Sequence, residues 1–302
     1  MPISESVLTL EDATADYPIM ADSRPSRVAI HFGAQTHPGK VRGNNEDHFL
    51  IARLAKTMQV YKTSLPGDGK TQVSEEEGHL IVVADGMGGA AAGERASALA
   101  VESVESFVQN TLQWFLHLGG RDEHVLLSEL RESLERADRT LIESARSNPA
   151  LQGMGTTLTM AYCVGSELFI VHAGDSRAYL FREGELDQLT NDHTLVQALV
   201  DDGAISSEQA RRHARRHVVT NVIGGPRPGV FVEIHKLVAR DGDLLLFCSD
   251  GLTEPVDDAT IAEVLRDQTD PQACCNRLVD LALRGGGPDN VTAIVARYQV
   301  QV

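Results

Sequence analysis

The sequence has 302 residues and carries 27 Lys and Arg against 43 Asp and Glu, a formal net charge of −16. Its 42% of hydrophobic and 23% of charged residues are typical of a globular protein and exclude a fibrous or disordered chain. The negative charge, without a stripe of Lys or Arg to offset it, argues against nucleic acid or an anionic membrane surface as a partner.

The first 26 residues show no sustained periodicity, and we expect residues 1–26 to form a flexible tail before one domain over 27–302. Runs of apolar and β-branched residues between Gly, Asp or Asn turns predict strands in that domain. The polar stretch 55–78 is predicted to be a long hairpin loop. The predicted strands cover 28–32, 47–54, 79–85, 156–164, 167–175, 177–182, 230–237, 243–250 and 290–298.

Apolar residues at helical spacing predict four helices, each with a single apolar stripe. They cover 93–118, 123–146, 257–268 and 271–284. The last helix is expected to begin with Asp270 as its cap and Pro271 at the first position. Several strand connections are too short for a parallel crossover, so we expect antiparallel sheets covered by helix layers.

The cysteines and the hydropathy pattern indicate a reducing compartment. Cys163, Cys248, Cys274 and Cys275 lack the spacing of a metal site, and we expect them to be reduced and packed in the core. No apolar stretch approaches the roughly 20 residues that cross a bilayer, and the first residues are acidic where a secretion signal is basic. We therefore expect a cytoplasmic protein.

Acidic residues gather at the ends of the predicted strands. Carboxylates collected at one rim of a core repel each other and lose hydration, so cations must compensate them if they stay charged. Oxygen donors without a His or Cys set favour Mg²⁺ or Mn²⁺ over zinc. The residues concerned are Glu46, Asp47, Asp85, Asp175, Asp250 and Asp289.

A structural explanation of the same acids stays open at this point. Asp-Gly after a strand is an ordinary turn, and the chain has further Asp-Gly pairs at 68–69, 202–203 and 241–242 that we do not expect to be ligands. The residues alone do not show whether the acids at the strand ends converge.

Eight motifs, in family order over about residues 28–300, resemble those of the metal-dependent protein phosphatases of type 2C, the PPM type, in their bacterial form. They are VRGNNED (41–47), VADGMGG (83–89), GERAS (93–97), MGTTL (154–158), HAGDSRAYL (172–180), NDHTLV (191–196), GDLLLFCSDGLTE (242–254) and GGPDNVTAIV (286–295). The resemblance implies an α+β fold, an α-β-β-α sandwich of two antiparallel sheets flanked by helix pairs.

The resemblance also implies a site for two Mn²⁺ or Mg²⁺ ions. Asp85 corresponds to the carboxylate that bridges them, and the carbonyl of Gly86 completes one ion. Asp250 and Asp289 correspond to ligands of the second ion. Asp175, together with Asp250, resembles the ligands of a third, weaker ion in bacterial members.

Four further residues match supporting positions of the family. Glu46 and Asp47 are expected to support metal-bound waters, and Asn290 to orient the region of Asp289. Arg42 matches the phosphate-binding arginine, whose fork of donors suits a tetrahedral dianion. Arg42 and Asp85 are therefore the expected catalytic residues.

The implied reaction is hydrolysis of phosphoserine and phosphothreonine by direct attack of a metal-bridging hydroxide, without a phosphoenzyme. Members of the family have a histidine at one of two positions near Asp85, where this chain has Met87 and Ala90. A metal-bound water is therefore expected to give the proton to the leaving group. His48 and His193 are expected to be structural rather than proton donors.

The segment 194–228 matches the position of the family's mobile flap and contains a basic cluster, Arg211, Arg212, Arg215 and Arg216. The cluster either steers acidic phosphosubstrates or is a solvated face paired with the protein's own acids. Two other functions stay open, a phosphatase-like module that binds phosphoproteins and a phosphoesterase for small molecules. We expect a monomer acting on substrates of a Ser/Thr kinase.

Overall fold

Apolar runs at the predicted positions form β-strands in the structure, a computed structural model that describes residues 27–59, 71–88, 90–110 and 120–301. The predicted tail, residues 1–26, lies outside the described residues. All strand pairs between the described residues are antiparallel, which confirms the prediction from the short connections.

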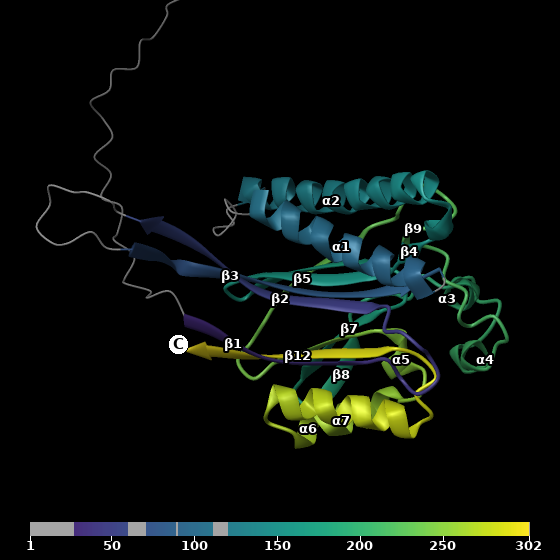
Figure 1. The fold of residues 1–302 in the computed structure, drawn as a ribbon. Coiled ribbons are helices and arrows are strands. Elements are labelled where there is room, and N and C mark those ends of the chain that lie inside the picture. Colours follow the sequence, from purple (N-terminus) through teal and green to yellow (C-terminus); the bar gives the residue numbers. More distant parts are fainter. Residues whose placement is uncertain (1–26, 60–70, 89, 111–119, 302) are drawn as a thin grey trace, which may run out of the picture.

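Over these described residues the strands form two sheets that face each other (Figure 1). The five-stranded sheet has the order β1 (Arg27–His37), β12 (Val291–Gln301), β11 (Leu244–Cys248), β7 (Arg177–Arg182) and β8 (Glu185–Gln188). The seven-stranded sheet has the order β10 (Glu233–Val238), β6 (Glu167–Ala173), β5 (Leu158–Val164), β3 (Thr71–Met87), β4 (Gly155–Thr156) and β9 (Ile223–Gly224), and β2 (Asp47–Gln59) pairs with β3.

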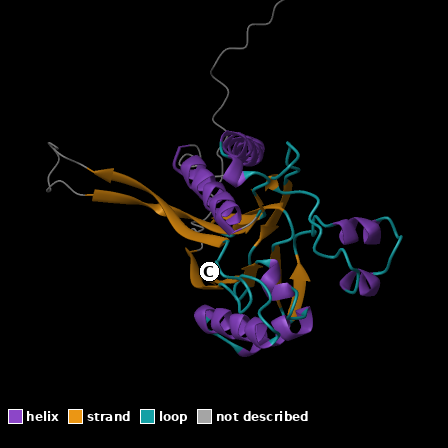
Figure 2. Cartoon of the chain, turned by 45° about the vertical axis from the view of Figure 1, so that its right-hand side comes forward, coloured by secondary structure: helices purple, strands orange, loops and turns teal. Residues whose placement is uncertain are grey.

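Helices cover the outer face of each sheet, which gives the predicted α-β-β-α sandwich (Figure 1). On the seven-stranded sheet lie α1 (Ala90–Asn110) and α2 (Gly120–Ser147), and on the five-stranded sheet α5 (Asp250–Thr253), α6 (Asp258–Asp267) and α7 (Pro271–Arg284). The short α3 (Leu195–Asp201) and α4 (Ser207–Arg211) stand apart from both layers (Figure 2). None of the described helices combines the length and the apolar character that crossing a membrane requires.

The alternation of side chains along β3 connects the layers of the sandwich. Leu80, Val82 and Ala84 pack against α1 and α2, whereas Ile81 and Val83 pack between the two sheets. Successive side chains of a strand point to opposite faces, so one continuous apolar run serves both cores. Each fully buried aliphatic side chain contributes about 1.5–3 kcal/mol, and β3 is therefore a central element of the fold.

The helix α7 begins as the sequence predicts. The Asp270 carboxylate accepts a hydrogen bond from the backbone N–H of Ala273 at 2.8 Å, and Pro271 occupies the first turn. The apolar face of α7 includes Cys274 and Cys275, and all four cysteines of the chain are buried and free, as expected.

The polar segment 55–78 is not a loop throughout, so this prediction is wrong in its extent. β2 continues to Gln59 and β3 begins at Thr71, with backbone pairing over both extensions after one irregularity. The two extensions project beyond the helix layers (Figure 1). Hydrogen bonds between the paired backbones stabilise them, and strands formed in this way do not require an apolar run in the sequence. Residues 60–70 lie outside the described part of the chain.

Candidate metal and phosphate site

The strand ends that carry the predicted acids meet at one edge of the sandwich, around a cavity of about 890 Å³. Its lining contains every predicted site residue except Asp47, namely Arg42, Glu46, Asp85, Gly86, Asp175, Asp250, Asp289 and Asn290. The structure therefore brings together acids that are up to 243 positions apart in the chain, since Glu46 and Asp289 line the same cavity (289 − 46 = 243).

Asp47 and Asp85 lie opposite each other in the pairing of β2 with β3. Next to them, the Gly86 N–H donates a hydrogen bond to the Glu46 carbonyl at 3.2 Å. A side chain on Gly86 would collide with the carbonyl of Gly93 in α1, so only glycine permits this approach of the helix. The register of one hairpin thus places Asp47 opposite Asp85, the one of the two that lines the cavity.

Asp47 does not line the cavity; its side chain is buried, 5% exposed, and links the two sheets. Its Oδ2 accepts hydrogen bonds from the hydroxyls of Ser249, after β11, and Thr292, in β12, both at 2.7 Å. Its Oδ1 is buried without a hydrogen-bond partner. Burial raises the pKa of Asp47 to about 7. An unpartnered buried carboxylate oxygen of this kind fits a site for a cation or its water ligand.

Three acids that line the cavity, Asp85, Asp175 and Asp250, have raised pKa values. Burial first, and then the charges of its acidic neighbours, hold the pKa of Asp85 well above its usual range. Burial and the charge of Asp250 do the same for Asp175. Burial and the charge of Asp289 raise the pKa of Asp250 to about 6, and its Oδ1 is also buried without a partner. Such a cluster favours bound divalent cations, which remove the repulsion.

Asn290 holds the loop that carries Arg42. Its Oδ1 accepts a hydrogen bond from the Glu46 N–H at 2.8 Å, and its Nδ2 donates to the carbonyls of Pro38 at 2.9 Å and Asn44 at 2.7 Å. The side chain therefore anchors both ends of the loop, besides standing next to Asp289. This is a wider contact than the sequence predicts for Asn290.

Arg42 points its guanidinium at Asp289. Its Nη2 donates a hydrogen bond to Asp289 Oδ2 at 2.7 Å, and this bond and the neighbouring charge raise the pKa of Arg42. The side chain is 56% exposed, so its remaining N–H groups are accessible from the cavity. A guanidinium held in this way can bind two oxygens of one phosphate.

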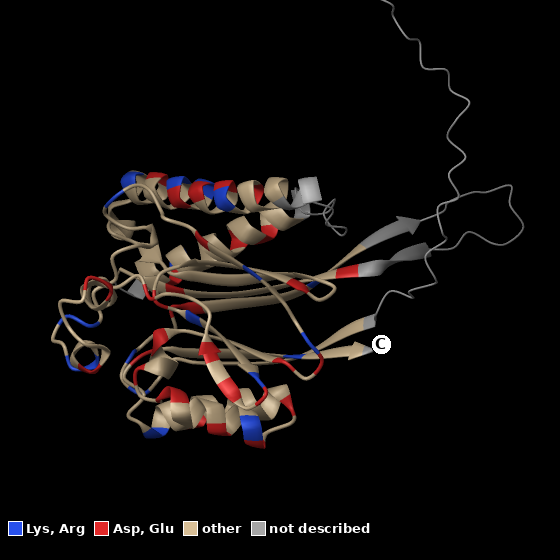
Figure 3. Ribbon diagram, turned by 180° about the vertical axis from the view of Figure 1, so that it is seen from behind, with Lys and Arg blue, Asp and Glu red and all other residues tan. Residues whose placement is uncertain are grey.

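The flap segment contributes residues that the sequence analysis did not assign to the site. Arg216 and His217 line the cavity and share Glu254, with Nε to Oε2 at 3.1 Å and Nδ1 to Oε1 at 3.3 Å. Among the predicted basic cluster only Arg216 lines the cavity, while Arg212 is 81% exposed and pairs with Glu208. Figure 3 shows Lys and Arg on the flap. Two features of the sequence could have pointed to these residues, namely the basic run at 211–217 and the motif residue Glu254.

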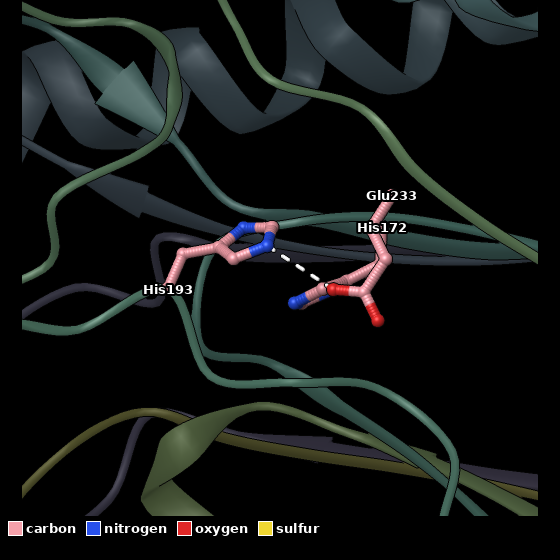
Figure 4. Close-up of side chains that lie close together, drawn as sticks. All are labelled: His172, His193 and Glu233. Atoms are coloured by element: carbon pink, nitrogen blue, oxygen red, sulfur yellow. Dashed lines mark hydrogen bonds and ion pairs between the residues drawn. The ribbon is translucent and has the colours of Figure 1, made fainter. Parts of the chain in front are cut away.

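A second polar group lies near the base of the flap, where His172, His193 and Glu233 bring possible ligand atoms within 4.8 Å of one another (Figure 4). These atoms have partners already: His193 Nε2 lies 3.1 Å from Glu233 Oε2, and His172 contacts Thr159 at 2.9 Å and the Asn191 carbonyl at 3.1 Å. Burial lowers the pKa of His172 to about 4, so its ring is neutral. The group is a satisfied hydrogen-bond network, separate from the acids of the cavity.

Neither histidine of the motif regions lines the cavity. His48 Nδ1 lies 3.0 Å from the Ser97 hydroxyl, which donates to the Glu46 carbonyl at 2.5 Å, and His193 belongs to the network just described. Met87 does line the cavity, at the position where the sequence departs from family histidines. The geometry favours structural roles for His48 and His193.

Comparison with known proteins connects this geometry to a family. The family model described as Protein phosphatase 2C matches residues 60–280. The serine/threonine protein phosphatase PstP of Mycobacterium tuberculosis is 38% identical over 269 residues, 89% of this chain and 45% of that protein. The chain thus spans about half the length of this curated relative.

Two further comparisons cover almost the whole of the matched proteins. The serine/threonine phosphatase stp of Listeria monocytogenes is 30% identical over 266 residues, 88% of this chain and 95% of that protein. The solved catalytic domain of PstP in complex with two manganese ions is 36% identical and has a TM-score of 0.69, with 90% of this chain and 100% of that chain covered. With these matches and the observed sandwich, the chain belongs to the protein phosphatase 2C family.

Proposed function

We propose that this chain is a phosphoprotein phosphatase that hydrolyses phosphoserine and phosphothreonine with the help of Mn²⁺ or Mg²⁺. The observation that carries the proposal is the convergence of acids from both sheets on one cavity, beside an arginine that a site carboxylate holds in place. The relatives named serine/threonine phosphatases, one of them solved with two manganese ions, support the same function.

The oxygen donors that line the cavity fit two divalent cations and one additional, weaker cation. Asp85, the Gly86 carbonyl, Asp250 and Asp289 would hold the pair, and Asp175 with Asp250 would hold the third. The unpartnered buried oxygen of Asp250 supports this assignment. Divalent cations in such a set supply charge stabilisation at the phosphoryl oxygens and a water acidic enough to attack at neutral pH.

The chain's own residues bind and orient the phosphate. The Arg42 guanidinium donates to two phosphoryl oxygens and stabilises the charge that develops on them, while Asp289 fixes its direction. Asn290 keeps the loop of Arg42 against β12, and Glu46 accepts hydrogen bonds from water in the cavity. With Met87 at the family's histidine position, solvent supplies the proton to the leaving Ser or Thr oxygen.

The partners follow from this chemistry. We propose phosphorylated proteins, made by a Ser/Thr kinase, as substrates, and a monomeric, cytoplasmic catalytic domain with a role in signalling. A module that only binds phosphoproteins would not need the complete set of acids that lines the cavity.

The proposal is tested by phosphate release from a phosphothreonine peptide and from p-nitrophenyl phosphate, with Mn²⁺ and with EDTA. We expect metal-dependent hydrolysis that falls at least about 100-fold in Asp250→Asn, because a ligand is lost. Asp202→Asn is the matched control, since Asp202 also precedes a glycine but lies outside the cavity lining. A folded wild-type chain without metal-dependent phosphate release from either compound would refute the function.

A further inference from the structure

His193 lies between the loop of Asp175 and the flap. Its backbone N–H donates to the Gly174 carbonyl at 2.7 Å, and the Gly174 N–H donates to the His193 ring at Nδ1, at 3.1 Å. Gly174 has a φ of 122°, a conformation in which other residues are strained, and it directly precedes Asp175. Two hydrogen bonds between Gly174 and His193, one donated by each residue, therefore set the direction in which the chain enters Asp175.

The same residue closes the base of the flap. The Thr220 N–H donates to the His193 carbonyl at 2.8 Å, and Asn221 Nδ2 donates to His193 Nδ1, also at 2.8 Å. Next to them, Thr194 and Val219 form an isolated antiparallel bridge. The chain thus leaves and re-enters the body at His193, and the intervening segment carries the cavity residues Arg216 and His217.

The hydrogen bonds fix the tautomer and the orientation of the ring. Because Nδ1 accepts from two N–H groups, the proton of the neutral ring is on Nε2, which donates to Glu233 Oε2 at 3.1 Å (Figure 4). The ring is enclosed by His172, at 4.8 Å between centroids, and Phe231, at 5.6 Å. Glu233 is held in turn by the side chain of Asn191 at 3.1 Å.

We propose that His193 is a positioning residue whose Nδ1 couples the Asp175 loop to the base of the flap. Asn221 and Gly174 both donate to His193 Nδ1, so a shift of the flap at Asn221 is transmitted to Gly174. The cation affinity of the site around Asp175 and the position of Arg216 therefore change together. The inference rests on the proposed function, in which Asp175 is a metal ligand.

Two substitutions separate the faces of the ring. His193→Asn keeps an acceptor at the position of Nδ1 and loses the donor to Glu233, whereas His193→Gln keeps a polar group toward Glu233 and loses the acceptor. His235→Gln is the matched control, because His235 also contacts Glu233 but has no contact with Gly174 among the hydrogen bonds of the described residues. Folding of each variant is checked by thermal unfolding.

The measurements are Mn²⁺ binding by calorimetry and amide exchange at residues 174–176 and 218–221. For His193→Gln we expect about 10-fold weaker Mn²⁺ binding at the weakest site, and faster exchange in both segments, since losing an outer partner of a ligand typically weakens metal binding this much. Wild type, His193→Asn and His235→Gln should agree within about 3-fold. At saturating Mn²⁺, His193→Gln should keep its kcat.

The coupling is overturned if His193→Gln matches the wild type, if only one of the two segments exchanges faster, or if His193→Asn loses as much as His193→Gln. If His193→Gln does not fold, Asn221→Ala replaces it, because Asn221 contacts His193 from the side of the flap. The coupling then requires faster amide exchange at 174–176, on the other side of His193. Failure of the proposed function shows separately, as a wild type without metal-dependent phosphate release, and the exchange measurement still tests the coupling in that case.

Discussion

Arg42 owes its direction to a residue of the site itself. Its guanidinium is exposed and would sample many rotamers, but the hydrogen bond to Asp289 at 2.7 Å directs it to the cavity. The same carboxylate is an expected metal ligand, so the binding of cation and of phosphate are linked at one side chain. Asn290 adds a second restraint, on the loop rather than on the side chain.

Substitution of Arg42 should therefore lower phosphate binding more than it lowers metal binding. Arg42→Ala is expected to reduce kcat/KM for a phosphothreonine peptide by about 10- to 100-fold, because charge-assisted hydrogen bonds contribute about 1.5–3 kcal/mol. Arg42→Lys should recover only part of this loss, since an ammonium lacks the planar fork. Steady-state kinetics at saturating Mn²⁺ measure the effect, and equal activity of Arg42→Lys and wild type would contradict it.

At the scale of elements, the flap brings one positively charged side chain, Arg216, to an acidic cavity. Arg216 and His217 reach the lining through their shared partner Glu254, which follows α5, whereas Arg212 stays in an exposed pair with Glu208. The predicted basic cluster thus divides into one residue at the cavity and others outside its lining. Because salt screens charges over about 10 Å, a residue that lines the cavity should attract an acidic substrate more strongly than one outside its lining.

Charge reversal should separate these positions. Arg216→Glu is expected to lower kcat/KM for an acidic phosphopeptide about 10-fold at low salt, with a smaller loss at high salt because ions screen the interaction. Arg212→Glu, the matched control on the same segment, should change it by less than about 2-fold. Equal effects of the two substitutions, or no dependence on salt, would show that Arg216 has no steering role.

The elements that the sequence predicted are those with long apolar runs. The strand cores and the four longer helices were identified from their periodicity, although residues 111–118 of the first predicted helix lie outside the described part of the chain. β8, β9 and α3 to α5 are too short to show a periodicity. The hairpin extensions to Gln59 and from Thr71 were missed because the backbone pairing of two strands forms them. Local sequence does not record such pairing.

The sequence predicted acids that line the cavity, but not the hydrogen bonds that hold Asp47 beside them. The motifs pointed to Asp85 and Asp250, but the hydrogen bonds of Asp47 to Ser249 and Thr292 join residues 202 and 245 positions apart and arise only when the sheets pack together. The network of His193 likewise joins separate elements. A single sequence holds no signal for these long-range partners.

For the whole molecule, the cavity lies where two sheets meet, and each sheet supplies acids. Asp85 and Asp175 extend from the seven-stranded sheet, and Asp250 and Asp289 from the five-stranded sheet. Bound cations would therefore connect the two halves of the sandwich. Without them, buried carboxylates oppose one another across the interface.

This arrangement predicts how stability depends on pH and metal. Asp47 and Asp250 have pKa values of about 7 and 6 in the fold against a usual 3.8, so the folded state binds more protons than the unfolded state between these values. In EDTA these carboxylates should thus lower the stability progressively as the pH rises from about 4 to about 7. Mn²⁺ at the proposed site would favour the deprotonated carboxylates and should stabilise the fold more at about pH 7.5 than at about pH 5.

The measurement is the melting temperature with Mn²⁺ minus that with EDTA at each pH. His172, with its pKa lowered to about 4, has the opposite pH trend but cancels in this difference, because it contributes to both samples. We expect a gain of about 5–10 °C at about pH 7.5 with Mn²⁺ near 100 times its dissociation constant. Asp250→Asn should reduce the gain, and a gain that is larger at the lower pH would contradict the prediction.

The division of the site between the two sheets also has a consequence for synthesis of the protein. Asp47 and Asp85 leave the ribosome before Asp250 and Asp289, and β1 pairs with β12, which directly follows Asp289 and Asn290. With the proposed ligands, a nascent chain would have no complete cation site until translation has passed residue 289. Interrupted translation would then yield fragments that lack the proposed activity.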